Sequence, residues 1–325
     1  MPAEWAAHAA TWMIFPPAVY GGSTTLAEAR AAWADVARTV ARFEQVEMIV
    51  RPKDLRAAKS LLNGVVEFVE FEVDDAWARD VLPTFVRSRG GQIIGVDWIF
   101  NGWGQQSWAH WEHDAKLAGA VGRYLGVSSH RAHIVNEGGG IEVDGTGTVV
   151  LTKSVQLDEG RNGAGARDLV ETDLHECLGV DRFIWLERGL AGDYQEFGTR
   201  GHVDLVVKFI DESVAVFHDQ RDKDHPDYEL SSSVRRTLTE AAIEAIALPA
   251  PARREVDGRV CDWSYVNCTF VNGALLVGTF DDEADDEALS VLRSALPGRE
   301  VVAVDARTLF SLGGGVHCVT QQQPN

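Results

Sequence analysis

The sequence predicts an α/β protein built as a closed ring of about five similar units. Three observations predict this fold class: paired strand-like runs joined by turn residues, a stretch with helical spacing after each pair, and a short strand after each helix. The unit returns about five times, at intervals of roughly 55 to 75 residues. A ring is favoured because each small sheet needs neighbours to bury its faces.

The paired runs are predicted to be hairpins because turn-forming residues separate two apolar stretches. They span residues 84–98, 139–153, 205–218 and 269–280, with turns at 89–91, 144–145, 211–212 and 272–273. The last of these turns is an Asn-Gly pair. An open doubly wound sheet is the competing architecture, but it alternates single strands with helices and does not need so many tight hairpins.

Helical spacing follows each hairpin, with Ser or Asp near the starts and Gly or Pro near the ends. These helices are predicted over residues 110–126, 164–179, 231–248 and 281–296. A short strand is expected after the helix, as at residues 181–187 and 299–305. The N-terminal part fits the same unit, with strands at 10–16 and 46–52 around a helix at 25–43.

Residues 1–325 are predicted to form a single domain, because no Pro/Ser/Gly-rich linker or composition change divides them. The composition, 45% hydrophobic and 24% charged, is that of a globular protein. No basic leader is present and no apolar run approaches the roughly 18 residues that cross a bilayer. We therefore expect a soluble, cytoplasmic protein with no membrane partner.

The charge is strongly acidic, with 49 Asp and Glu against 30 Lys and Arg and a formal net charge of -19. This field repels phosphate backbones and anionic lipids, so we expect no nucleic-acid partner, and it mildly favours a small cation. A solvated acidic surface that serves solubility explains the charge equally simply. The four cysteines are too sparse for a disulfide framework and form no C-x-x-C zinc motif, so reduced thiols are expected.

Four segments concentrate reactive side chains where strands are expected to end: "VDDAWARDVLPTF", "IVNEGGGIEV", "TRGHVDLVV" and "GGGVHCV". Equivalent strand ends converge near the axis of a ring of repeats. One central site is therefore predicted to collect Asp80, Glu137, His202, Asp204 and Cys318.

Each carboxylate segment also has a plain structural explanation. His202 and Asp204 are two apart on a strand-like run and would share a face, which is equally consistent with the polar face of an edge strand. Glu137 precedes three glycines that clear space for a ligand or only form a turn. Asp80 has acidic neighbours, and Trp77 shares a wall with it if the segment turns helically, although an aromatic is more often core.

Cys318 is the strongest candidate for a nucleophile. Cys177 and Cys268 fit buried structural positions and Cys261 has no clear context, whereas Cys318 follows His317 and three glycines. Backbone N–H groups on such a turn, or a cation bound close by, would lower the thiol pKa.

The candidate residues are a thiol, a histidine and three carboxylates, and the sequence has no serine elbow, P-loop or zinc motif. This set fits acyl transfer poorly, because the carboxylates would repel the negative charge of an oxyanion. The same residues fit a guanidinium, which is planar, permanently charged and pairs bidentately with carboxylates. Its central carbon is then open to a thiolate.

These motifs, taken in order, resemble the agmatine deiminases, guanidine-modifying enzymes with the pentein fold, a five-bladed pseudo-symmetric α/β-propeller. The resemblance runs end to end and is carried by "MPAEW", "ATWMIFP", "DDAWARD", "FNGWG", "EGGGIEVDGTGT", "GHVD", "SYVN" and "GGGVHCVTQQQP". It implies hydrolysis of agmatine, a small cationic guanidine, to a ureido compound and ammonia, without a metal or an organic cofactor. A homodimer or higher form is expected by analogy alone.

The resemblance also implies roles for the residues of the site. Cys318 would form a covalent thiouronium intermediate, and His202 would protonate departing ammonia and then activate water. Asp80 and Asp204 would hold the guanidinium, and Glu137 would support His202 or the substrate. Trp77 and Gly314 are expected to contact the substrate as well.

Three positions depart from the family pattern: Leu82 and Gln105 where Gly is usual, and Gly315 where Asn is usual. They touch loops expected to shape the far end of the pocket, so another alkylguanidine is a further candidate substrate.

Three alternatives remain at this point. The first is an amidinotransferase or dihydrolase of the same fold, against which the closing motif argues, and the second is a non-catalytic pentein that serves as a binding module. The third is a metallohydrolase built from His110, His113, His202 and Asp204. The spacing of "HWEH" does not place two helical histidines on one face at i, i+4, which disfavours a metal site.

Overall fold

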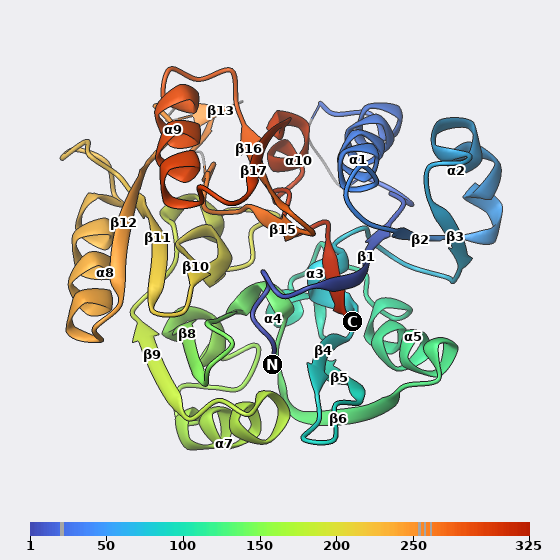
Figure 1. Ribbon diagram of the computed structural model, residues 1–325, viewed down its shortest axis with the longest axis horizontal. Helices are drawn as coiled ribbons and strands as arrows, with labels where there is room; N and C mark the ends of the chain where they lie inside the picture. The colour runs from blue at the N-terminus through green and yellow to red at the C-terminus, as the bar shows by residue number, and fades with distance from the viewer. Residues whose placement is uncertain (20–22, 253–254, 257, 261) are drawn as a thin grey trace.

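Five small mixed sheets surround a common axis in the computed structural model, which describes residues 1–19, 23–252, 255–256, 258–260 and 262–325 (Figure 1). We call these sheets blades 1 to 5. The predicted fold class, a five-bladed α/β-propeller, is confirmed. No helix within the described ranges has the length and apolar character needed to span a bilayer.

The blades follow one another around the ring in chain order. Blade 1 contains β18 (Gln321–Pro324), β1 (His8–Ile14), β2 (Val46–Val50) and β3 (Glu67–Glu70). Blade 2 contains β4 (Thr84–Arg87), β5 (Ile93–Ile99) and β6 (Ser128–Val135), and blade 3 contains β7 (Ile141–Val143), β8 (Thr148–Thr152) and β9 (Arg182–Leu186). Blade 4 contains β10 (Val207–Asp211), β11 (Val214–Asp219) and β12 (Glu244–Pro249), and blade 5 contains β15 (Thr269–Val271), β16 (Ala274–Thr279) and β17 (Glu300–Asp305). A separate ribbon pairs β13 (Glu255–Val256) with β14 (Arg259–Val260).

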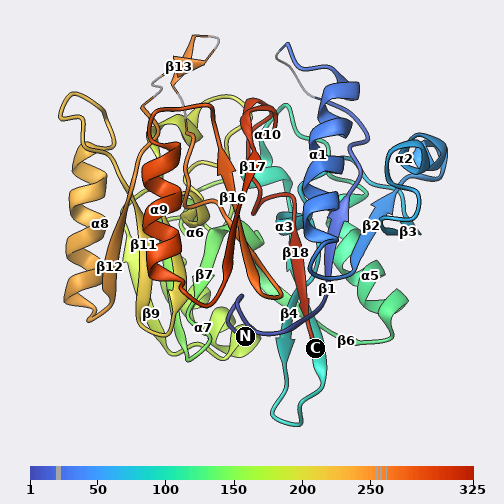
Figure 2. The same cartoon turned by 45° about the horizontal axis from the view of Figure 1, so that its top comes forward.

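Every blade repeats one connection rule. Its first two strands pair antiparallel, and its second and third strands pair parallel across a helix. The crossover helices are α1 (Leu26–Val40), α5 (Leu117–Leu125), α7 (Arg167–Leu178), α8 (Tyr228–Glu240) and α9 (Asp285–Ala295), and α2 (Leu55–Leu62) leads into the extra strand β3. These helices lie on the outside of the ring in both ribbon views (Figures 1 and 2).

Local sequence signals account for where the helices begin and end. Thr25 and Glu28 form a capping box at the start of α1, which satisfies N–H groups that have no partner inside the helix. Gly126 and Gly179 end α5 and α7 in the left-handed conformation that glycine adopts without steric cost.

The predicted helix over residues 231–248 is wrong in its second half. α8 ends at Glu240, and Glu244–Pro249 forms β12, which pairs parallel with β11. Ala and Glu in "AAIEAIALP" have helical propensity, but burial beside β11 stabilises the extended form. The helix predicted over residues 110–126 begins only at Leu117, after a 3-10 turn at Asp114–Lys116. The other predicted helices and strands are present, with ends that differ by a few residues.

Blade 1 is completed by the last strand of the chain. β18 occupies the place that β4, β7, β10 and β15 hold in the other blades, and it pairs antiparallel with β1, with Trp12 opposite Gln321. The N- and C-terminal segments therefore lie side by side and close the ring (Figures 1 and 2). This closure was not predicted from the sequence.

Candidate active site

The predicted site residues lie on short turns that lead into the first strand of a blade. The turns are α3 (Ala78–Val81) before β4, a 3-10 turn (Gly138–Gly140) before β7, a second one (Val203–Leu205) before β10, and a turn at residues 316–319 before β18. Only the segment of Glu137 directly follows a strand, β6, which ends at Val135, so the expectation that all four segments end strands is wrong. The equivalent turns of a pseudo-symmetric ring converge at its axis, and the residues predicted to form one central site lie together there.

Gly139 shows how closely the turns approach one another. A methyl group placed on its Cα would lie 2.5 Å from His202 Nδ1 and 3.1 Å from a carboxylate oxygen of both Asp204 and Asp80. The glycine leaves room at the point where an imidazole and two carboxylates meet.

The Cys318 thiol lies beside this point and is 7% exposed. Its Sγ is 3.7 Å from Asp204 Oδ2 and accepts a hydrogen bond from Asn267 Nδ2 at 3.3 Å. Arg79 fixes the turn, because its backbone N–H donates to the carbonyl of Cys318 and its Nε to that of His317.

Burial, together with the Asp204 and Asp80 carboxylates, raises the pKa of the Cys318 thiol well above its usual range. Hydrogen bonds from the Gly315 backbone on the turn and from the Asn267 side chain lower this pKa, as expected, but burial and the two carboxylates outweigh them, so the net shift is the reverse of the expectation. A cation bound close to the sulfur, the second predicted cause, would oppose the two carboxylates.

Trp77 and Gly314 lie next to the thiol. A methyl group on Gly314 would be 2.7 Å from the Trp77 ring and 3.1 Å from Cys318 Sγ, so Gly314 allows these two side chains to approach. Trp77 caps the N-terminus of α3, and the predicted helical turn between Trp77 and Asp80 is present.

His202 is almost fully buried and faces two carboxylates. Its Nε2 is 3.2 Å from Glu137 Oε2, and its Nδ1 is 4.0 Å from Asp80 Oδ1. Burial lowers the pKa of His202, but Asp80 and Glu137 outweigh burial and raise it to about 9. The imidazole is therefore cationic near neutral pH.

Glu137 and Asp193 hold His202 in place, and each makes further buried hydrogen bonds. Arg161 Nε donates to both Glu137 oxygens at 3.0 Å; burial raises the pKa of Glu137, but Arg161 and His202 lower it to about 2. Asp193 accepts hydrogen bonds from the backbone N–H groups of Thr199, Gly201 and His202.

His202 and Asp204 are not on a strand, which corrects the sequence-based explanation for their shared face. His202 precedes the 3-10 turn Val203–Leu205, and Asp204 lies within it. The tight turn nevertheless directs both side chains to Gly139.

The two aspartates differ in how their oxygens are used. Asp80 accepts from the Trp103 indole N–H at 2.9 Å and from the Gly139 backbone N–H at 3.0 Å, and burial and Glu137 raise its pKa. Asp204 Oδ2 lies 2.8 Å from His317 Nδ1; burial raises the pKa of Asp204, but the hydrogen bond and charge of His317 lower it overall. Asp204 Oδ1 is buried and has no hydrogen-bond partner among the described residues.

Asn267 is a site residue that sequence reasoning missed. It lies on the turn before β15, the fifth equivalent position of the ring, and is fully buried. Its side chain donates to Cys318 Sγ and accepts from the His317 backbone N–H. The sequence signal was the "SYVN" motif, which was noted without a role.

An aromatic pocket lies beside Trp77. Its walls include Trp33, Trp77, Trp108 and Phe197, and Asp75 is the only charged side chain among its described lining residues. Burial raises the pKa of Asp75 to about 7. An alkyl chain with a cationic end fits such walls, because aromatic faces and a carboxylate both attract a cation.

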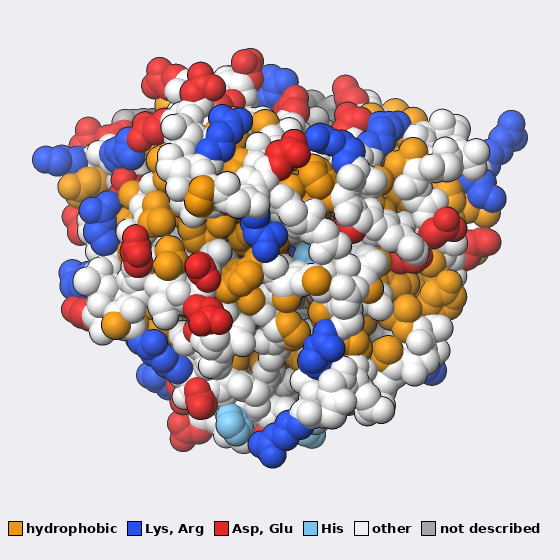
Figure 3. Space-filling view, viewed as in Figure 1, with side chains coloured by type: hydrophobic (Ala, Val, Ile, Leu, Met, Phe, Trp, Pro, Cys, Tyr) orange, Lys and Arg blue, Asp and Glu red, His pale blue; other side chains and the backbone are white. Residues whose placement is uncertain are grey.

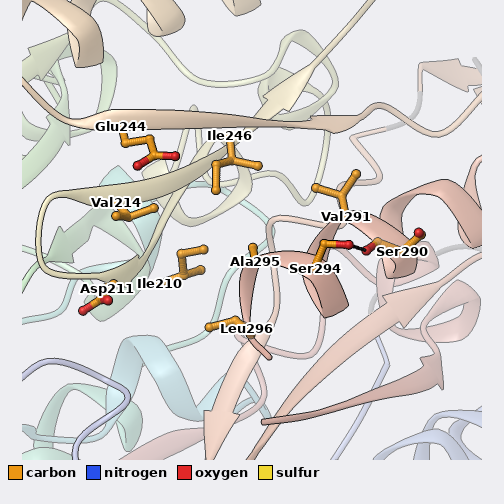
Figure 4. A pocket seen from close by; sticks show the side chains of 10 residues that line it. All are labelled: Ile210, Asp211, Val214, Glu244, Ile246, Ser290, Val291, Ser294, Ala295 and Leu296. Atoms are coloured by element: carbon orange, nitrogen blue, oxygen red, sulfur yellow. Dashed lines mark hydrogen bonds between the residues drawn. The ribbon is translucent and has the colours of Figure 1, made fainter. Parts of the chain in front are cut away.

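A larger groove lies between blades 4 and 5 (Figures 1 and 4). It is lined by residues of β10, β11, β12 and α9, and its charged side chains are Asp211 and Glu244. It contains no thiol or imidazole, so the axial cluster is the candidate reactive centre.

The three departures from the family pattern have different surroundings. Leu82 is 1% exposed and belongs to the hydrophobic core, so it does not line the pocket as expected. Gly315 faces Asn267 and Phe310, and a methyl group there would lie 2.3 Å from Asn267 Oδ1. Gln105 is exposed, with a positive φ of 60°.

The residues of the predicted metal alternative do not form a common cluster. His113 contacts Asp74 at 2.8 Å, whereas His202 faces Glu137. Within the described ranges, no group of three or more His, Cys, Asp or Glu side chains is arranged to hold a metal ion. Cys177 and Cys268 are buried and unpaired, and Cys261 lies outside the described residues.

The surface shows charges of both signs. On the face seen in Figure 3, Lys and Arg side chains alternate with Asp and Glu around the rim. The acidic excess is therefore not gathered into one patch on this face.

Comparison with known proteins places the chain in a family. The family of Porphyromonas-type peptidyl-arginine deiminases matches residues 1–324. A Streptomyces avermitilis protein, provisionally named an agmatine deiminase, is 48% identical over all of this chain and 96% of its own length. The chain belongs to the Porphyromonas-type peptidyl-arginine deiminase family. The agmatine deiminase of Stutzerimonas stutzeri is a further relative, 35% identical over all of this chain and 95% of its own.

Solved structures of this deiminase family share the fold. The agmatine deiminase of Enterococcus faecalis superimposes with a TM-score of 0.92 at 28% identity, over all of this chain and 95% of its own. A C. jejuni agmatine deiminase, a cysteine-to-serine variant with substrate bound, superimposes with a TM-score of 0.91 at 25% identity, over 100% of this chain and 96% of its own. A dimethylarginine dimethylaminohydrolase, 13% identical with a TM-score of 0.55, shares the fold alone.

Proposed function

We propose that this chain is an agmatine deiminase that hydrolyses the guanidinium group of agmatine to N-carbamoylputrescine and ammonia through a covalent Cys318 intermediate. The observation that carries the proposal is the buried Asp204 Oδ1, an acceptor without a partner, beside Asp80, His202 and the Cys318 thiol. Burying an unpaired carboxylate oxygen is costly, and a guanidinium N–H is the donor that fits it. Relatives that are named agmatine deiminases support the same substrate.

Substrate binding activates the nucleophile in this mechanism. Asp80 and Asp204 hold the guanidinium nitrogens and direct its central carbon toward Cys318 Sγ. The bound cation neutralises the carboxylates that raise the thiol pKa, so the thiol releases its proton to solvent and becomes a thiolate. The sulfur attacks the guanidinium carbon, and the C–S bond forms as a C=N π bond opens onto nitrogen and gives a tetrahedral adduct.

The first half of the reaction ends with loss of ammonia. His202, held cationic by Glu137 and Asp80, donates a proton to one NH₂ group of the tetrahedral adduct. The C–N bond breaks, ammonia departs, and Cys318 remains bound to the amidino carbon as a thiouronium.

Water completes the reaction in the second half. The now neutral His202 takes a proton from water, and the hydroxide adds to the thiouronium carbon. The C–S bond then breaks and returns the electron pair to sulfur, the hydroxyl proton is lost to solvent, and a ureido product leaves.

The aromatic pocket favours agmatine over arginine. Asp75 attracts the distal ammonium of agmatine, whereas the α-carboxylate of arginine would find no cation among the described lining residues. A second carboxylate beside Asp75 would also be repelled.

The proposal is tested by incubating the protein with agmatine, arginine and other alkylguanidines, and following ammonia release and product mass. We expect the product of agmatine to contain oxygen in place of one NH group. Mass spectrometry of a reaction that is quenched after a short time should show a covalent adduct on Cys318. Cys318→Ala is expected to lose the adduct and at least about 10⁴-fold in kcat, while Cys177→Ala, a buried cysteine in α7, keeps both.

Two outcomes would contradict the proposal. Ammonia release by Cys318→Ala at the unaltered rate would show that Cys318 is not the nucleophile. An amidino group passed to added glycine or lysine, instead of to water, would make the chain an amidinotransferase.

A further inference from the structure

Glu4 and His317 form a buried relay behind Asp204. His317 Nδ1 lies 2.8 Å from Asp204 Oδ2, and His317 Nε2 lies 2.9 Å from Glu4 Oε2. Contacts at both ring nitrogens fix the orientation of the imidazole between the two carboxylates. Glu4 thereby holds the ring with Nδ1 directed at Asp204.

We infer that Glu4, acting through His317, is a positioning residue for the guanidinium-binding carboxylate Asp204. The inference rests on the proposed function, because it assigns the relay to capture of the same substrate. His317 engages one oxygen of Asp204 and leaves the other, Oδ1, for the substrate. If the relay were cut, Asp204 could turn and pair both oxygens elsewhere, and the acceptor would no longer be preorganised.

Glu4 is itself fixed from several blades. Its Oε2 accepts from Lys208 Nζ of β10 at 2.5 Å, and its Oε1 accepts from the Phe270 backbone N–H of β15 at 2.9 Å. Arg79 Nη2 of α3 lies 3.9 Å away, and Glu142 of β7 lies 3.6 Å from Lys208 Nζ. The relay therefore connects the N-terminal segment, blades 3 to 5 and the α3 turn before blade 2 to the Asp204 carboxylate.

The N-terminal segment is also anchored to the rest of the protein by contacts outside the relay. Glu44 provides a second buried link, because it accepts from the Asn272 backbone N–H and the Thr11 hydroxyl and lies 3.1 Å from His8 Nδ1. It touches no residue of the reactive centre in the described contacts. Glu44 is thus a control, a buried carboxylate with a similar anchoring role. It reaches Glu4 only through His8, at the Glu4 backbone carbonyl, and not at the Glu4 carboxylate that contacts His317.

The test measures agmatine affinity by calorimetry in Cys318→Ser protein, where chemistry is blocked, together with thermal stability. We expect Glu4→Gln to weaken binding about tenfold, equivalent to about 1.4 kcal/mol, and Glu4→Asp, which keeps the charge, to recover part of it. Glu44→Gln is expected to lower thermal stability by a similar amount with unchanged affinity.

A double-mutant cycle separates positioning from general loosening. His317→Gln keeps one amide donor, which can reach Asp204 or Glu4 but not both, and leaves the other Glu4 contacts in place. It is expected to lose as much affinity as Glu4→Gln, and the double variant no more than either. It also provides the decisive measurement if Glu4→Gln does not fold.

The outcomes are distinguishable from failure of the proposed function. If Cys318→Ser protein does not bind agmatine at all, the function is wrong. If it binds and Glu4→Gln or His317→Gln binds as tightly, or if their losses simply add, the relay is structural and the inference is overturned.

Discussion

The positive charge of His202 is stabilised by the neighbouring carboxylates. An imidazole buried alone would be neutral at pH 7, but Asp80 and Glu137 overcome the burial and raise its pKa from 6.5 to about 9. A raised pKa in the folded state stabilises the protein below pH 6.5 and loses that contribution as the pH rises through about 9. Over the same range His202 loses the proton that, in the proposed mechanism, it donates to the departing amino group.

Glu137→Gln tests this link between charge and catalysis. Removing the carboxylate 3.2 Å from Nε2 destabilises the imidazolium, so the pKa of His202 falls and the alkaline limb of kcat/KM for agmatine moves from about 9 toward 6.5. The rate-pH profile measures the shift, and Glu44→Gln should leave the limb in place. An unmoved limb in Glu137→Gln would show that another group controls it.

Sequence reasoning identified the proposed reacting groups but not the residues that hold them in place. Cys318, His202 and the carboxylates stood out because their chemistry is unusual in combination. Asn267 and Glu4 did not, since an amide and an acid far away in the chain carry no local signal of the hydrogen bonds that they make to Cys318 and His317. The thiol pKa was predicted in the wrong direction because burial and neighbouring charges depend on the tertiary fold.

The turn Gly138–Gly140 illustrates how an element can be shaped by a site. A side chain on Gly139 would project into the space between His202, Asp204 and Asp80. Its φ lies outside the left-handed region, so space, and not backbone conformation, demands glycine here.

We therefore expect Gly139→Ala to fold and to lose about a hundredfold or more in kcat/KM, since displacing a catalytic group by about 1 Å has that effect. Gly298→Ala is the matched control, because a methyl group there meets no atom within 4 Å and the φ is also outside the left-handed region. Melting curves and agmatine kinetics of the two variants provide the comparison. Full activity in Gly139→Ala would mean that the space is not used by the substrate.

The hairpins were the most predictable elements, since turn residues and apolar alternation are both local. β12 was mistaken for helix because its residues have helical propensity and only pairing with β11 selects the strand. The reactive turns were assigned to strand ends because α3 and the 3-10 turns are too short to produce a periodic pattern.

Closure of the ring depends on both ends of the chain. β18 supplies the first strand of blade 1 from the far end of the chain, and it also carries the turn that holds Cys318. Repeat counting indicated a ring but not its seam, because the strand-like pattern at residues 321–324 is polar and short. We therefore expect Cys318 to be correctly placed only when the ring closes.

A chain that stops after Thr320 tests this dependence, because it keeps Cys318 but lacks β18. It loses the pairing with β1, the bond from Trp12 Nε1 to Gln323 and the bond from Arg79 Nη1 to Gln322. If these losses amount to about 5 kcal/mol, Tm falls by roughly 10 °C, and the open edge of β1 promotes aggregation. Differential scanning calorimetry and ammonia release measure both effects, and a chain that stops after Pro324 keeps β18 and should behave like the full protein. Normal melting and turnover in the shorter chain would show that the Cys318 turn is held without closure of blade 1.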